Sequence, residues 1–275
     1  MEVMGDTSKL EQVWRPVDGT DKYYLGQLVK TAADGTGGDG VVVATTASGA
    51  ADTSNKQIIE GVINGFNDVT PTYEDGSDVT GFNGQELEGV VTQTDINARN
   101  WFGQEGMWSK GDPSPMAEVF LIDSATWIKA SLFATSFGTA PALLTSTAGN
   151  ANGLTVTTNA CDFTPVTDGR QTIYARTGAN ATQYRVTDDN STTVATWDRA
   201  MRATTAATGE TYVRVPLQQG WSFMNIDTEG LYVEVDDTPA TNYFLVYVRE
   251  LNLKEAGKEF VVFRFAPLHF DELRA

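Results

Sequence analysis

Residues 231–239, Leu-Tyr-Val-Glu-Val-Asp-Asp-Thr-Pro, decide the fold class of this chain. Side chains alternate over residues 231–235, with three aliphatic residues on one face of an extended strand and Tyr232 and Glu234 on the other. A period of two followed by turn-forming residues is typical of a half-exposed β-strand that enters a turn. Residues 260–263, Phe-Val-Val-Phe, are apolar at every position, which predicts a central strand buried on both faces.

Comparable strand candidates recur along the whole chain of 275 residues. Thr is abundant and fits pleated, half-buried surfaces, while the 26 Gly residues supply turns between short strands. The spacing between candidates, about eight to twelve residues, is typical of sandwiches and barrels. The candidate strands are residues 23–29, 41–45, 58–63, 87–92, 107–109, 117–122, 127–132, 153–158, 171–176, 183–187, 212–217, 222–226, 231–235, 243–249 and 260–265.

Helical periodicity is scarce, and the best helical candidates, residues 191–202 and 251–257, are both short. Nothing follows the strand-helix-strand rhythm of a parallel sheet. We therefore predict a mainly β chain with little helix, built as antiparallel β-barrels or sandwiches. Small, turn-forming residues over 136–153 predict a boundary between two β domains, residues 18–145 and 146–275.

The charge of the chain restricts its partners. Acidic residues number 36 against 19 basic ones, giving a formal net charge of −17, although only 20% of the residues are charged. A chain this negative, without a Lys/Arg cluster, is repelled by phosphate backbones, so we expect no nucleic-acid partner. No apolar run approaches the roughly 18 residues that cross a bilayer, and the N-terminus lacks the pattern of a secretory signal, so we expect no membrane partner.

The composition also disfavours an enzyme. Cys161 and His269 are the only residues of their types, so an intrachain disulfide, a Cys-based metal cage and a His-rich zinc site are excluded. The Gly-x-Ser-x-Gly elbow, the phosphate-binding loop and His-Glu-x-x-His are all missing from the sequence. We expect His269 to be a surface residue, and we predict no catalytic residue, no metal and no cofactor.

Three patterns have both a functional and a structural interpretation. Residues 33–40 resemble a glycine-rich calcium repeat, but a single copy favours a flexible hairpin loop. The carboxylates of residues 188–189 and 236–237 could serve glycoside hydrolysis, but their positions are typical of turns. Tryptophan side chains could form a carbohydrate platform, although core or subunit-interface positions are commoner in β proteins. The six are Trp14, Trp101, Trp108, Trp127, Trp197 and Trp221.

Segments of the first half carry a resemblance to a known family. They are residues 23–29 (Tyr-Tyr-Leu-Gly-Gln-Leu-Val), 57–63 (Gln-Ile-Ile-Glu-Gly-Val-Ile) and 106–111 (Gly-Met-Trp-Ser-Lys-Gly). The chain resembles head decoration (cement) proteins of tailed bacteriophages, in which an Ile-x-Gly-Val strand belongs to a small barrel. Residues 174–181, Tyr-Ala-Arg-Thr-Gly-Ala-Asn-Ala, resemble segments of virion structural proteins of marine-type phages.

The resemblance implies a virion structural protein with a decoration-like barrel over residues 18–145. Such a protein binds the outer surface of the assembled head, stabilises the junctions between capsomers and is often a homotrimer. Its partner would be the major capsid protein, and no chemistry is required. Compact decoration proteins are often about half this length, so residues from about 150 onward imply an additional β domain whose role the resemblance leaves open.

The N-terminal residues have two interpretations. Residues 1–17 could form an arm that adds a strand to a capsid sheet, with Val13, Trp14 and Pro16 at the capsid interface and Trp14 as an apolar anchor. Alternatively, Val13 and Trp14 begin the first strand of the barrel.

Two alternatives come from other functional classes. The second domain could be a glycan-binding module that attaches the virion to a host or a surface. The chain could also be a carbohydrate-active enzyme that uses an undetected Asp/Glu pair about 5–10 Å apart in a groove. In the decoration interpretation, the negative charge predicts a position on the outer face of the head, away from the packaged genome.

Overall fold

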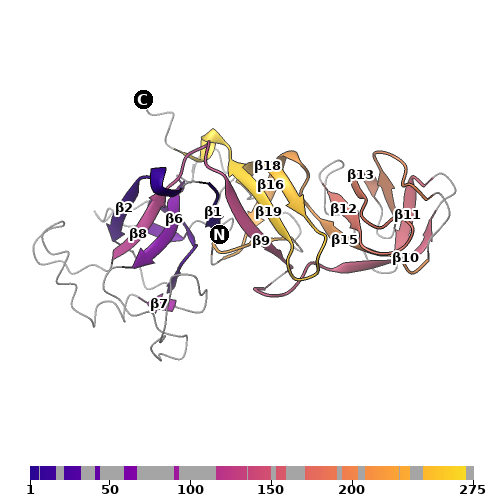
Figure 1. Cartoon of the computed structure of the whole chain (residues 1–275), viewed down its shortest axis with the longest axis horizontal. Helices are drawn as coiled ribbons and strands as arrows, with labels where there is room; N and C mark the ends of the chain where they lie inside the picture. The colour runs from indigo at the N-terminus through magenta and orange to yellow at the C-terminus, as the bar shows by residue number, and fades with distance from the viewer. Residues whose placement is uncertain are drawn as a thin grey trace, which may run out of the picture. The chain divides into compact units, whose positions relative to one another are not determined.

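The computed structural model of the chain is built from β-strands (Figure 1). It describes residues 1–5, 7–16, 22–31, 41–43, 59–66, 90–92, 116–134, 136–149, 153–158, 171–190, 194–203, 208–228, 230–235 and 244–270. No α-helix occurs among these residues, whose helical turns are the 3₁₀ helices η1 (Thr7–Lys9) and η3 (Pro267–His269). The predicted mainly β fold with antiparallel sheets is therefore confirmed. Within the described ranges, no helix is long and apolar enough to span a membrane.

The strands are short, as the turn-rich sequence predicts. In chain order they are β1 (Glu2–Val3), β2 (Gln12–Pro16), β3 (Lys22–Tyr24), β4 (Leu28–Thr31), β5 (Val41–Val43), β6 (Ile59–Phe66), β7 (Val90–Thr92), β8 (Met116–Leu121), β9 (Ile128–Phe133), β10 (Leu143–Gly149), β11 (Thr155–Thr158), β12 (Thr172–Ala175), β13 (Tyr184–Asn190), β14 (Val194–Trp197), β15 (Thr211–Val215), β16 (Gly220–Ile226), β17 (Val233–Glu234), β18 (Phe244–Asn252) and β19 (Phe260–Phe265).

Internal contacts divide the chain into two compact units. Unit 1 comprises residues 1–128, 228–231 and 267–275, and unit 2 comprises residues 129–227 and 232–266. The boundary expected at residue 145 falls inside β10 of unit 2.

Unit 1 contains an antiparallel five-stranded sheet in the order β2-β8-β6-β4-β5 and a separate pair, β3-β7. Leu28, Ile63 and Val119 are buried in its core. A Cβ atom on Gly61 would lie 2.0 Å from the Phe120 carbonyl oxygen, so β6 and β8 can approach each other only with glycine at this position.

The strand predicted over residues 23–29 is divided in the structure. β3 ends at Tyr24 and β4 begins at Leu28, with a turn at Leu25 and Gly26 between them. Gly26 has φ +77°, which favours glycine, and the Tyr24 N–H donates a hydrogen bond to Gln27 Oε1 at 3.0 Å. The turn therefore interrupts an otherwise apolar and aromatic run.

Unit 2 contains a closed antiparallel barrel in the strand order β10-β11-β14-β13-β12-β15 (Figure 1). The indole of Trp197 stacks on the ring of Tyr212, with centroids 6.4 Å apart, in its interior. Leu144, Val156 and Ile173 complete this core from three further strands. The alternation of buried and half-buried residues along β11 and β14 matches the period of two for a barrel wall.

The two helical candidates are wrong. Residues 194–197 of the first form β14, because Ala195 and Trp197 alternate with half-buried Val194 and Thr196, and this pattern lets the segment bury one face in the barrel. In the second candidate, β18 continues to Asn252, and a turn then leads to β19.

The other sheet of unit 2 has the strand order β9-β17-β16-β18-β19, and β9 also pairs with β19. β16 is antiparallel to both β17 and β18, and β18 is antiparallel to β19, whereas β17 and β9 run parallel. Phe244, Phe263 and Phe265 are fully buried and meet edge to face. In the stretch that predicted the fold class, the strand is limited to β17, and the predicted alternation holds only for buried Val233, half-buried Glu234 and buried Val235. Tyr232 is buried and Leu231 is half-buried, so the period of two is wrong for the first two residues.

Candidate functional site

The predicted interface residues Val13, Trp14 and Pro16 all lie in β2, at one end of the five-stranded sheet. They pair with β8 in the register Val13 with Val119, Trp14 with Glu118 and Pro16 with Met116. The three residues are therefore brought together in one edge strand of a sheet within the chain. Val13 is half-buried.

His269 differs from its expected surface position. It lies in η3 and only 2% of it is exposed. The neighbouring Ala266 and Phe270 are buried as well, so the apolar residues around the histidine draw this segment into the protein.

Several sequence-based candidates lie outside the described residues. They are Cys161, Trp101, Trp108, the glycine-rich residues 33–40 and the carboxylates of residues 236–237. Within the described ranges, no group of three or more His, Cys, Asp or Glu side chains is arranged to hold a metal ion.

A buried carboxylate, Glu210, lies directly before β15, with 3% of the residue exposed. It accepts a hydrogen bond from the Tyr212 hydroxyl, and two more from the backbone N–H and the side-chain amide of Asn180, at 3.3 and 3.4 Å. Gln183 donates to Asn180 Oδ1 at 3.1 Å, and Ser146 Oγ accepts the Glu210 N–H at 3.1 Å. We call these five residues the Glu210 cluster.

The sequence motif at residues 174–181 has a structural explanation in this cluster. Gly178 has φ +82°, and a Cβ atom there would lie 2.2 Å from both Cγ and Oε1 of Glu210. Asn180, two residues later, binds the same carboxylate through two donors. The Gly-x-Asn part of the motif therefore forms a close cover over Glu210.

Burial raises the pKa of Tyr212, and the hydrogen bond that its hydroxyl donates to Glu210 raises it further. The tyrosine therefore remains a neutral donor to the carboxylate in the folded chain. Three donors from two residues satisfy Glu210, and hydrogen bonds of this kind are how a carboxylate is accommodated in a protein interior. We interpret the Glu210 cluster as a structural element of the barrel.

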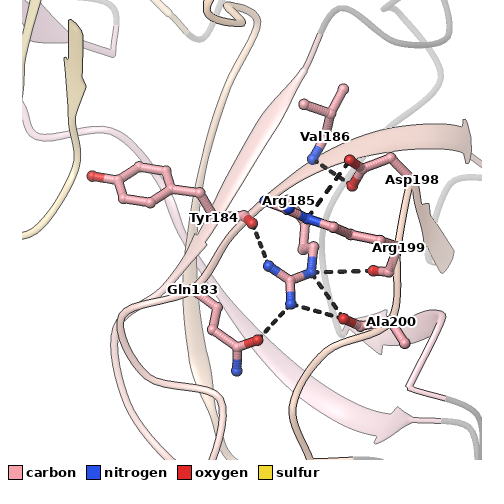
Figure 2. A network of polar contacts seen from close by, with 7 residues as sticks. All are labelled: Gln183, Tyr184, Arg185, Val186, Asp198, Arg199 and Ala200. Atoms are coloured by element: carbon pink, nitrogen blue, oxygen red, sulfur yellow. Dashed lines mark hydrogen bonds and ion pairs between the residues drawn. The ribbon is translucent and has the colours of Figure 1, made fainter.

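The Arg185 network joins β13 to the segment that follows β14 (Figure 2). The Arg185 guanidinium donates to the carbonyl oxygens of Tyr184, Arg199 and Ala200 at 2.6, 3.1 and 2.7 Å. It also donates to Gln183 Oε1 at 2.5 Å, and this links it to the Glu210 cluster. Burial, and then the charge of Arg199, lower the pKa of Arg185.

An ion pair between Arg176 and Glu259 connects the barrel with the turn between β18 and β19, inside unit 2. Of their side chains, 9% and 0% are exposed. Arg176 Nε donates to the Leu253 carbonyl oxygen at 3.1 Å, and the Leu253 N–H donates to the Tyr184 hydroxyl at 3.2 Å. The polar contacts of Arg176 therefore hold this turn against the barrel.

Of the tryptophans considered for a carbohydrate platform, Trp197 is buried and Trp127 is half-buried, whereas Trp221 is 51% exposed. Trp221 lies on β16 opposite Tyr247 of β18, which in turn lies opposite Arg264 of β19. We call Trp221, Tyr247 and Arg264 the aromatic row. The three residues lie in or beside the predicted strands 222–226, 243–249 and 260–265, but the pairing of those strands was needed to assemble the row.

No similar protein indicates what these arrangements of residues do. In comparisons with protein families, curated proteins and solved structures, nothing matches the chain. Its function therefore has to be inferred from its own residues.

Proposed function

We propose that this chain is a structural protein of a bacteriophage virion that binds the outer surface of the head and stabilises the junctions between capsomers. The observation that carries the proposal is the position of the Ile-x-Gly-Val segment, residues 59–62. This segment is the centre of the five-stranded sheet, where Gly61 permits the close approach of β8. Residues 28–29 of another resembling segment pair directly with Val62 and Gly61. Two segments that carry the resemblance thus build one sheet.

The proposed contact with the capsid is β2. This strand pairs with β8 along one edge, and β8 is its only partner strand among the residues that the structure describes. An edge strand can extend a sheet of another protein through its backbone N–H and C=O groups. Trp14 supplies the apolar anchor in this proposal, because tryptophan is enriched among the residues that dominate binding energy.

The stabilisation follows from mass action. A protein that binds the assembled lattice, and not the separated subunits, shifts the equilibrium towards the lattice by an amount that grows with its concentration relative to its dissociation constant. The net charge of −17 favours the outer face of the head over the interior that holds the DNA. Homotrimers would match the threefold junctions between capsomers, where three copies can each contact an equivalent surface.

Sedimentation tests this proposal. The purified chain should sediment as a trimer and should pellet with empty heads assembled from the capsid protein of the same genome, but not with unassembled capsid protein. Trp14→Ala should weaken head binding by about tenfold or more. Trp221→Ala, which removes an exposed tryptophan from unit 2, serves as the matched control and should bind heads normally. Failure of the wild-type chain to pellet with heads would reject the proposal.

A further inference from the structure

The aromatic row is a continuous feature of the exposed face of β16, β18 and β19. Trp221 pairs with Tyr247, and Tyr247 pairs with Arg264, in one line across the three strands. Residues directly opposite each other on neighbouring strands point to the same face of a sheet. The opposite face carries the buried phenylalanines of the core, so the row points outward.

The two rings of the row form a corner. The centroids of Trp221 and Tyr247 lie 5.4 Å apart with the ring planes at 83°. The Arg264 guanidinium carbon lies 5.4 Å from the centroid of the Tyr247 ring and holds that ring in place from β19. Phe223 and Leu245, the next outward pair along the strands, are half-buried and extend an apolar floor beside the corner. With 51% of it exposed, Trp221 is the residue of the corner most open to solvent.

Cationic groups accompany the rings. Arg264 belongs to the row itself, and Arg249, two residues after Tyr247, is exposed. Two arginines beside an exposed tryptophan are notable in a chain with 36 acidic and 19 basic residues. Glu250, which is also exposed, follows Arg249 at a β-bulge. The two guanidinium groups beside the rings are donors that suit the carboxylate of an anionic ligand.

We propose that the aromatic row binds acidic polysaccharide, with the apolar face of a pyranose ring stacked on Trp221 and the carboxylate of a uronic acid bound by Arg264 and Arg249. Flat indole surfaces suit the C–H face of a sugar ring, and the planar guanidinium fork matches a carboxylate. This activity goes beyond head binding and does not depend on it. On a virion, it would attach the particle to an acidic surface coat.

The test is calorimetric titration of the full chain with polygalacturonate, and with dextran as the neutral polymer. Polygalacturonate should bind, more weakly as salt is added, and dextran should bind at least about tenfold more weakly. Trp221→Ala should lose at least about tenfold in affinity for polygalacturonate. Arg264→Gln should reduce both the affinity and its salt dependence.

Two matched controls separate the aromatic row from the effect of losing any exposed aromatic ring or any exposed arginine of unit 2. Phe137→Ala removes another exposed aromatic ring of unit 2, one that is 56% exposed, and Arg199→Gln removes another exposed arginine. Both should bind polygalacturonate as the wild type does. The proposal is overturned if the wild type gives no binding heat, if Phe137→Ala weakens binding as much as Trp221→Ala, or if dextran binds equally well. It is also overturned if Trp221→Ala instead dissociates an oligomer that the wild type forms, because the row would then be a contact between copies.

Discussion

At the residue scale, Gly178 and Gly209 have the same backbone angle, φ +82°, but different surroundings. A Cβ atom on Gly178 would meet the side chain of Glu210 at 2.2 Å, whereas one on Gly209 would have nothing within 4 Å. An alanine at either position must adopt a left-handed conformation, which costs about 1 kcal/mol. At Gly178 the buried carboxylate must move as well.

We therefore predict that Gly178→Ala lowers the free energy of unfolding by about 2–4 kcal/mol, and Gly209→Ala by only about 1 kcal/mol. Urea unfolding followed by tryptophan fluorescence measures both, since Trp197 lies in the barrel core. Equal losses for the two variants would show that Gly178 matters only for its backbone angle and that the cover over Glu210 contributes nothing.

Tyr212 makes the stability of the barrel depend on pH. Burial and the hydrogen bond to Glu210 raise its pKa in the folded chain, while the unfolded chain has an ordinary tyrosine pKa of about 10. Above that pH the unfolded chain loses a proton that the folded chain keeps, so the unfolded state binds fewer protons and stability falls as pH rises. Below it, both states are protonated and this contribution is fully present.

The resulting prediction concerns how steeply the free energy of unfolding falls as the pH rises. In urea unfolding at pH values from about 8 to 11, the wild type should lose stability above about pH 10, and Tyr212→Phe should lose it less steeply. Tyr212→Phe should also be less stable at neutral pH, because Glu210 loses a buried donor. Parallel slopes for the two proteins would contradict the role assigned to this tyrosine.

The sequence could suggest some of these residues but not their partners. The sequence shows the Gly-x-Asn pattern at residues 178–180 as part of a motif, and it predicts strands on both sides, over residues 171–176 and 183–187. Its partner Glu210 is 30 residues away, and nothing local distinguishes Glu210 from an exposed glutamate. The surface position predicted for His269 is wrong for a similar reason, because its burial depends on how residues 266–270 pack.

At the element scale, the turn between β18 and β19 is held by Arg176 through Glu259 and the Leu253 carbonyl. Removing one member of a buried ion pair leaves the other charge buried without compensation. Arg176→Met should therefore lower the free energy of unfolding by about 3–5 kcal/mol. The double variant Arg176→Met with Glu259→Met should lose less, since no isolated charge remains.

The same turn offers a control. Lys258 and Glu255 form an exposed pair, with Nζ and Oε1 2.7 Å apart. Lys258→Met should leave the stability in urea unchanged within error, because water screens such pairs. If Arg176→Met were no more destabilising than Lys258→Met, the ion pair would not hold the turn to the barrel.

Strands with a clear hydrophobic pattern could be predicted from the sequence, whereas short strands that mix small, polar and apolar residues could not. β19 follows from residues 260–263, whose apolar side chains predict a buried strand. Of residues 231–235, only 233–235 keep the predicted alternation, because Tyr232 is buried as well. β14 lies within a predicted helix, because four residues are too few to distinguish a period of two from 3.6. β10 lies within the stretch that predicts a domain boundary, since its small Thr, Ser, Ala and Gly residues also favour turns.

At the scale of the whole molecule, the chain returns to unit 1 twice after leaving it, at residues 228–231 and again from residue 267. Leu28 donates its N–H to the Gly230 carbonyl oxygen at 2.9 Å, which ties the first of these returns to β4. A change in amino-acid composition can predict a single domain boundary along the sequence. The later returns of the chain to unit 1 depend instead on contacts between residues that are about 200 positions apart. The closure of the barrel likewise depends on pairing β10 with β15.

The central claim, that this chain decorates the outside of a phage head, is tested most directly by cryo-electron microscopy. Heads assembled from the capsid protein of the same genome would be imaged with and without the purified chain. We predict additional density on the outer surface at symmetry-related capsomer junctions, at a size that fits copies of a 29.7 kDa chain. Identical reconstructions with and without the chain, or additional density only inside the shell, would contradict the account.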